Sequence, residues 1–71
     1  MATKYWNSPV PAKDDFNFTI TDQVIDGRTL MGSWAIMTPE AYKLYGMNRF
    51  GTGYGQRYEK QADGQWLKVE G

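Results

Sequence analysis

Glycine occupies every second position of one short segment, Gly51-Thr52-Gly53-Tyr54-Gly55-Gln56. Glycine reaches positive φ without steric cost but loses the most backbone entropy on folding. Three glycines so close together therefore indicate a backbone that bends sharply or approaches another group closely. The chemistry that such a loop offers is the binding of a phosphate by backbone N–H groups.

A phosphate-binding loop needs a strand before it and a helix after it, so that the helix N-terminus faces the anion. In this chain the glycine segment follows a predicted helix and precedes a predicted strand, and the Gly-Lys-Ser/Thr ending is absent. We therefore expect the three glycines to form a tight turn over an aromatic core rather than a phosphate site.

Residues 49–60 combine aromatic and basic side chains, which suits single-stranded nucleic acid because bases stack on rings while lysine and arginine neutralise phosphates. Residues 43–60 carry four basic side chains against one acidic side chain. The whole chain has eight of each and a formal net charge of zero, whereas nucleic-acid-binding domains are normally basic. The alternative is that Phe50 and Tyr58 belong to the core, while the arginines are solvated or pair with aspartates.

Groups that could catalyse a reaction are scarce. Histidine and cysteine are absent, which removes the usual neutral-pH base, thiolate metal ligands and disulfides. Asp14 and Asp15 are adjacent, and neighbouring residues on a strand point to opposite faces. The serines and threonines have no histidine to activate them. The sequence therefore predicts a protein that is not an enzyme and holds neither a metal nor a cofactor.

Seventy-one residues make one thin domain, which buries only about 60% of the surface of its unfolded chain. Aromatic residues make up 15% of the chain. We expect their large buried areas to stabilise the domain in place of a disulfide or metal, with self-association as a further source of stability. No apolar run approaches the roughly 20 residues of a membrane span. The N-terminus has no apolar core of the secretory type. We expect a cytosolic setting and no membrane partner.

Prolines and side-chain periodicity predict how the first half of the chain is organised. Residues 1–13 form an irregular arm, because Pro9 and Pro11 favour extended backbone, and residues 14–71 form a single domain. Alternating apolar residues predict a strand from Asp14-Asp15 to Val24-Ile25, and Asp26-Gly27 predicts a type I′ hairpin turn. The returning strand covers residues 28–37. Its expected inward-facing residues are Leu30, Trp34 and Ile36.

Capping residues predict a short helix after the first hairpin. Thr38 is placed to cap it, Pro39 suits its first position, and Gly46 is placed to end it. Two further strands over residues 56–60 and 65–69 flank a turn at residues 62–64. The predicted fold is a small α+β domain of two β-hairpins and one short helix in the order ββαββ.

Three segments resemble a family of small, largely uncharacterised bacteriophage-type proteins. They are Asp26-Gly27-Arg28-Thr29, residues 32–37 (Gly-Ser-Trp-Ala-Ile-Met) and residues 51–58 (Gly-Thr-Gly-Tyr-Gly-Gln-Arg-Tyr). The family carries D-G-x-T, G-P-W-A-x-M-C-x-x-C and G-x-G-x-G-Q-x-Y in this order. An upstream C-x-x-C completes what looks like a four-cysteine zinc ribbon. The resemblance implies a zinc-ribbon-like topology over roughly residues 18–58.

This chain departs from the family pattern at the metal site. Thr38 and Ala41 stand where the second cysteine pair would be, and Ser33 stands where proline is usual. The first pair would fall near Lys13 and Phe16. We expect hydrophobic packing of Phe16 on Ala41 and Tyr42 to replace the zinc, which leaves a metal-free ribbon.

We expect a non-enzymatic interaction protein that docks on a larger protein, either a host factor that it inhibits or modulates or a virion component. Host cytoplasm or the virion is the expected location. The alternative function is a ribbon that binds single-stranded nucleic acid through residues 49–60. The predicted contact residues are Arg49, Phe50, Tyr54, Arg57, Tyr58 and Trp66.

Overall fold

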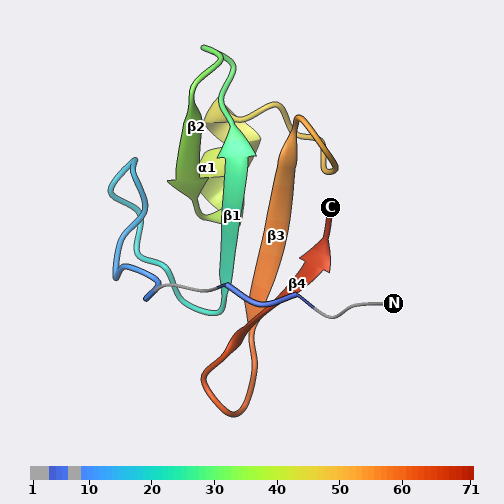
Figure 1. Ribbon diagram of the computed structural model, residues 1–71. Helices are drawn as coiled ribbons and strands as arrows, with labels where there is room; N and C mark the ends of the chain where they lie inside the picture. The colour runs from blue at the N-terminus through green and yellow to red at the C-terminus, as the bar shows by residue number, and fades with distance from the viewer. Residues whose placement is uncertain (1–3, 7–8) are drawn as a thin grey trace.

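The computed structural model describes residues 4–6 and 9–71, which form four strands and one helix. The elements are β1 (Gln23–Arg28), β2 (Trp34–Met37), α1 (Pro39–Tyr45), β3 (Gly55–Lys60) and β4 (Trp66–Glu70). All strand pairs are antiparallel and form one sheet in the order β2-β1-β3-β4 (Figure 1). The predicted α+β class and the ββαββ order are confirmed.

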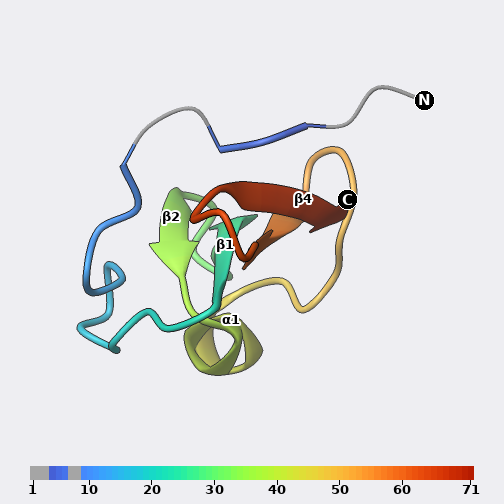
Figure 2. The same cartoon turned by 90° about the horizontal axis from the view of Figure 1, so that it is seen from below.

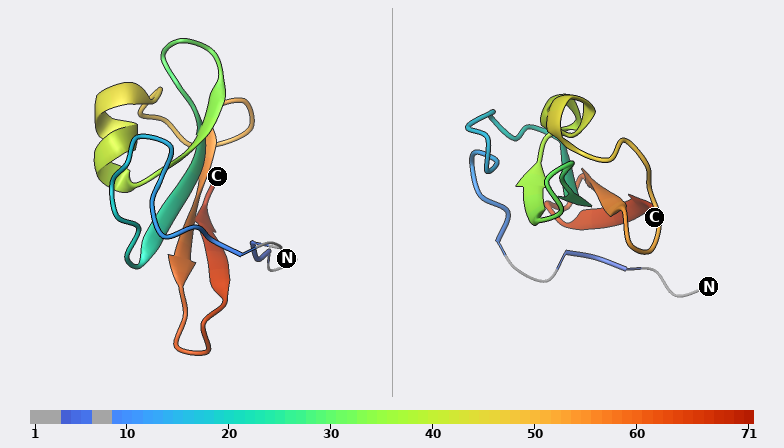
Figure 3. Two further views of the ribbon diagram at one scale, coloured as in Figure 1. Left: turned by 90° about the vertical axis from the view of Figure 1, so that its left-hand side faces the viewer. Right: turned by 90° about the horizontal axis from the view of Figure 1, so that it is seen from above.

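The two faces of the sheet are covered differently. Helix α1 packs on one face, which we call the helix face, and the N-terminal arm crosses the other, which we call the arm face (Figures 2 and 3). On the helix face, Ile25 forms the buried core with Met37, Ala41 and Tyr42. On the arm face, Val24 is fully buried. The central strand β1 therefore contributes a buried residue to each side.

The arm itself pairs with the edge of the sheet. The N–H of Trp6 donates to the carbonyl of Trp66 at 2.9 Å, and the N–H of Lys68 donates to the carbonyl of Lys4 at 2.8 Å. The predicted irregular arm is thus partly an added strand on β4. Residues 1–3 and 7–8 of that arm lie outside the described residues.

The turn predicted at Asp26-Gly27 is wrong, because both residues lie inside β1 and are paired on both sides. Gly27 is opposite Ala35 of β2 and Gly55 of β3. The chain reverses instead at residues 29–33, where the N–H of Thr29 donates to the carbonyl of Ser33 at 2.8 Å. A Cβ on Gly27 would lie 2.6 Å from the ring of Tyr42. Glycine is needed here for the close approach of a ring, and not for a turn.

The strand predicted to begin at Asp14-Asp15 is also wrong, since β1 begins at Gln23. Residues 12–20 fold back on themselves around the buried carboxylate of Asp14. Its oxygens accept from the N–H groups of Phe16 at 2.9 Å, Phe18 at 2.8 Å and Thr38 at 2.7 Å, and from the Thr38 hydroxyl at 2.9 Å. Asp14 therefore joins this loop to the start of α1.

Phe16 packs where the sequence predicts it. It lies against the core cluster that contains Ala41 and Tyr42, and its ring stacks on Tyr45 at 4.5 Å. Two of the three inward positions predicted for the returning strand are wrong, because Leu30 is 69% exposed and Trp34 48% exposed, while Ile36 is half-buried. The strand β2 is shorter than predicted, so Leu30 falls in the turn.

The predicted helix and second hairpin are confirmed. The Thr38 hydroxyl accepts from the N–H of Ala41 at 3.2 Å, and α1 ends at Gly46. A Cβ on Gly46 would lie 2.0 Å from the Tyr42 ring, so this glycine also makes room for that ring. Between β3 and β4, the turn closes with a 2.7 Å bond from the N–H of Gln61 to the carbonyl of Gln65.

We predict that Asp14→Asn destabilises the protein by about 2 to 3 kcal/mol at pH 7, because an amide cannot accept from all four donors. Burial by itself would raise the pKa of Asp14, but the hydrogen bonds from Thr38, Phe18 and Phe16 outweigh it, so the folded-state pKa lies below the ordinary value. The stabilisation is therefore complete at neutral pH and is lost as the pH falls through the carboxyl range, between about pH 5 and pH 2. Urea unfolding of both proteins across that range measures the difference.

Asp15→Asn is the matched control, because Asp15 is exposed and its carboxylate accepts one described bond, from Ile36 N–H. We expect it to cost under about 1 kcal/mol. Equal losses for Asp14→Asn and Asp15→Asn, or a loss for Asp14→Asn that does not shrink in acid, would contradict the prediction.

Gly46→Ala is expected to cost about 3 kcal/mol or more, because the added methyl group overlaps the buried Tyr42 ring. Gly32→Ala separates crowding from backbone strain. Gly32 has a φ of +97°, but a Cβ there meets nothing within 4 Å. We expect about 1 kcal/mol for Gly32→Ala. Thermal melts of the two variants test the order, and a larger loss at Gly32 would refute it.

Candidate functional site

The glycine segment forms a closed turn, as its sequence predicts. Gly51 and Gly53 have φ values of +121° and +86°. The N–H groups of Gly51, Tyr54 and Gly55 all hydrogen-bond within the turn, at 2.8, 3.0 and 3.0 Å. These donors are therefore not directed at an external anion, which argues against a phosphate cradle.

The six predicted contact residues do not form one surface. Arg57 and Tyr58 are consecutive on β3, so their side chains point to opposite faces of the sheet. Tyr58 packs edge-on against Trp6 at 5.1 Å, and the carbonyl of Trp66 accepts from the N–H of Trp6. Tyr58 and Trp66 thus belong to the region where the arm meets the sheet.

Arg57 lies on the helix face, beside a groove of about 450 Å³ between α1 and β3. Its guanidinium pairs with Glu70 at 2.9 Å and lies 6.0 Å from the ring centre of Phe50. Phe50 is half-buried against Tyr42. Arg49 lies over the ring of Tyr54 at 4.5 Å, at the glycine turn. The charge of Arg57 is thus partly compensated, while Arg49 and Tyr54 form a separate stacked pair.

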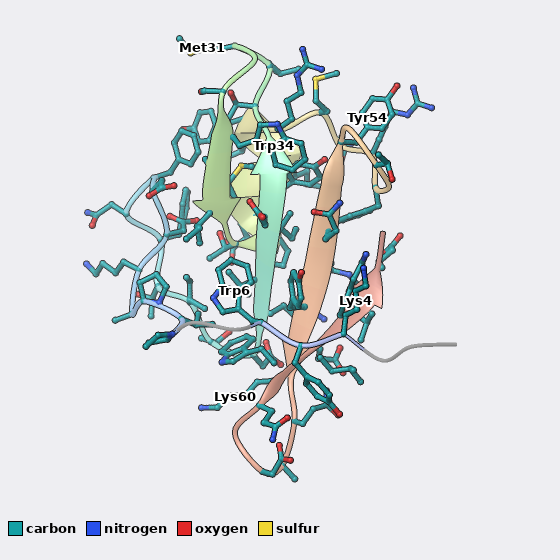
Figure 4. The ribbon with its side chains drawn as sticks, viewed as in Figure 1. Lys4, Trp6, Met31, Trp34, Tyr54 and Lys60 are labelled. Carbon is teal, nitrogen blue, oxygen red and sulfur yellow. The ribbon has the colours of Figure 1, made fainter. Side chains whose placement is uncertain are left out.

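Exposed apolar side chains, which sequence reasoning missed, occur at the tip of the β1–β2 hairpin, where Figure 4 labels Met31, and at the end of α1. Trp34 borders this group from the edge of β2, with its ring over the arm face. The group surrounds a groove of about 490 Å³. We call it the apolar patch. Its members and their exposed fractions are Leu30 at 69%, Met31 at 94%, Trp34 at 48%, Leu44 at 59% and Tyr45 at 44%.

Main-chain hydrogen bonds hold the two parts of the apolar patch together. The N–H of Leu30 donates to the carbonyl of Tyr45 at 2.8 Å, and the N–H of Met47 donates to the carbonyl of Arg28 at 3.0 Å. The hairpin tip is therefore fixed to the end of α1. The patch is a preformed surface on ordered backbone, and not a set of unrelated exposed residues.

The groove in the apolar patch is bordered, among the described residues, by one charged residue. Asp15 is the charged residue among those that line it, and its carboxylate accepts from the N–H of Ile36 at 2.7 Å. The remaining polar lining comes from Thr29 and Ser33 (with the phenol of Tyr45), and the Thr29 hydroxyl donates to the carbonyl of Ser33. An apolar group that carries no negative charge is the ligand that this lining accommodates.

Asp26 is partly buried, and the fold gives its ionised carboxylate no stabilising partner among the described residues. Burial raises the pKa of its carboxyl, and no hydrogen bond to that carboxyl comes from the residues that the structure describes. The pKa of Tyr58 is raised by burial and by the charge of Asp26. The two groups lie near each other on the arm face, but neither is joined to a nucleophile or metal ligand set there.

Comparison with known proteins yields no relative: no family model matches the chain, and neither curated proteins nor solved structures give a significant match. The resemblance to a bacteriophage-type family therefore stays a prediction. Among residues 4–6 and 9–71, no three acidic, histidine or cysteine side chains come together in a way that could hold a metal ion. The described part of the chain contains no helix with the length and apolarity to cross a membrane.

We expect Asp26→Asn to stabilise the protein by about 1 kcal/mol at pH 7, because the substitution removes a partly buried carboxylate that lacks a hydrogen-bond donor. The pKa of Asp26 is raised on folding, so stability falls as the pH rises through the carboxyl range. The advantage of the variant should disappear below that range, where Asp26 is protonated. Melting temperatures at pH 7 and about pH 3 test this, and an Asp26→Asn protein that melts lower at pH 7 would contradict it.

Proposed function

We propose that this protein acts by binding another protein through the apolar patch. The observation that supports this is the gathering of large apolar side chains around one groove, in a domain whose buried core contains few such residues. Large contiguous apolar patches on a soluble domain mark interaction sites, because their exposure to water is unfavourable. The protein contributes a rigid binding surface rather than a reaction.

The residue types in the apolar patch suit a protein partner. Tryptophan and tyrosine are enriched among the residues that dominate binding energy at interfaces. Met31 adapts its shape to a partner because its side chain is unbranched and flexible. The sequence resemblance supports a bacterial host protein or a virion component as the larger partner, and this choice rests on the resemblance alone.

A second candidate is single-stranded nucleic acid, and the stacking of Arg49 on Tyr54 supports it by placing a cation and a ring side by side. The zero net charge and the pairing of Arg57 with Glu70 count against it. Gel retardation with single-stranded DNA and RNA at low and moderate salt separates the candidates, because phosphate contacts weaken steeply with salt. Absence of a shift at low salt would exclude this candidate.

The double variant Leu30→Ser/Leu44→Ser is expected to weaken partner binding at least tenfold, since each buried leucine contributes about 1.5 to 3 kcal/mol. The measurement is capture from bacterial lysate, followed by titration of the purified partner. Val69→Ser is the matched control, because Val69 is 42% exposed but lies on β4, outside the apolar patch. If wild type and the double variant capture the same proteins with equal affinity, the apolar patch is not the docking surface.

A further inference from the structure

The outer edge of β2 borders the groove of the apolar patch. In an antiparallel pair, alternate residues of a strand direct their N–H and C=O groups toward the neighbouring strand. The carbonyl of Ser33 accepts from Thr29, and Ala35 is opposite Gly27. The main-chain groups of Ser33 and Ala35 therefore face β1, and those of Trp34 and Ile36 point away from it, out of the sheet.

The outward groups of Ile36 are already bonded, the carbonyl to the main chain of Asp15 and the N–H to its side chain. The N–H of Asp15 donates to the carbonyl of Ile36 at 2.9 Å, and the N–H of Ile36 donates to the Asp15 carboxylate at 2.7 Å. The outward N–H and C=O of Trp34 make no hydrogen bond with residues 4–6 or 9–71. One pairing position on this edge is thus filled by the chain itself, and the next is open beside the groove.

The opposite edge of the sheet shows how the chain covers an edge elsewhere. On β4, the carbonyl of Trp66 and the N–H of Lys68 are both bonded to the arm. Unpaired strand edges bind extended segments by main-chain hydrogen bonds, with pockets for alternate side chains. At Trp34 the open main-chain groups and the apolar groove lie together, which is what such binding requires.

We propose that the partner enters the groove as an extended segment that pairs with Trp34 and continues the sheet beyond β2. This inference rests on the proposed docking function and specifies its mode. The segment is apolar at alternate positions, where its side chains meet Phe16, Leu44 and Tyr45. It carries no acidic side chain beside Asp15, whose exposed carboxylate is the one charge among the described residues of the groove and would repel it.

A second copy of this chain does not fit the same position through its own β2. If two β2 strands paired antiparallel at Trp34, residue 32 of one copy would lie opposite Ile36 of the other. Asp15 already occupies that place in each copy. The open groups of Trp34 therefore fit a segment of a different protein better than the β2 strand of a second copy, and Asp15 leaves that segment room only toward the hairpin tip.

The test uses a display library of random twelve-residue peptides, selected against the intact protein, with the enriched peptides then synthesised. Trp34→Pro removes the outward N–H at an edge position where proline is tolerated, and Trp34→Val keeps that N–H while it also removes the ring. We expect enriched peptides with apolar residues at alternate positions, which bind Trp34→Pro at least tenfold more weakly than Trp34→Val. The melting temperature of each variant is measured alongside.

A second measurement needs no variant of the protein. Scanning an enriched peptide with single N-methyl groups should abolish binding at one position, whose amide faces Trp34, because Asp15 fills the pairing position at Ile36 and the N–H of Gly32 is bonded to Thr29 within the turn. Losses with helical spacing, equal binding to Trp34→Pro and Trp34→Val, or failure to enrich any peptide would overturn the inference. Peptides that bind both Trp34 variants equally but fail on Leu30→Ser/Leu44→Ser would overturn edge pairing while leaving the docking function in place.

Discussion

The buried ring of Tyr42 determines how the helix, the sheet and the glycine turn meet. Glycines stand where this side chain passes closest to the backbone: Gly27 in β1, Gly46 at the end of α1 and Gly55 at the start of β3. Its hydroxyl donates to the main chain around the glycine turn, where it contacts the carbonyl of Arg49 and, at 3.1 Å, that of Tyr54. One phenol therefore packs against the sheet through its ring and holds a loop through its oxygen. Chain segments that are far apart in sequence converge on it.

The position of the apolar patch follows from that packing. Because the ring seats α1 firmly against β1, the last carbonyl of the helix meets the N–H of Leu30, and the hairpin tip is held against the helix end. Asp14 acts at the other end of α1, where its carboxylate binds Thr38 and orders the preceding loop. The helix is short and would be marginal alone, so both ends depend on tertiary contacts. A small core is sufficient because a few groups each connect several segments.

Sequence reasoning succeeded where local chemistry decides the structure and was wrong where distant contacts decide it. Thr38 begins the helix through its capping hydroxyl, so that bound follows from local chemistry. Gly46 was correctly predicted to end the helix, but its φ of −92° is open to any residue, and the need for glycine there comes from the Tyr42 ring. Asp26-Gly27 resembles a turn, but the need for glycine there comes from a ring fifteen residues later in the chain. The exposure of Leu30 depends on strand length and register, which a single sequence specifies weakly. The separation of Arg57 and Tyr58 onto opposite faces, by contrast, could have been predicted, because both lie in the segment 56–60 that was expected to form a strand.

The pairing of the arm with β4 also shapes how this domain assembles. The bond between Trp6 and Trp66 joins residues sixty positions apart, so its formation closes almost the longest loop that the chain can make. Closure of long loops is entropically costly, and contacts of this kind slow folding relative to local ones. The hairpins and the helix can form first, and during that interval the rim of β4 is open to strands of other molecules. Pairing of residues 4–6 with β4 thus protects this rim against aggregation, and because these residues precede β4 in the chain, they are already synthesised when β4 is made.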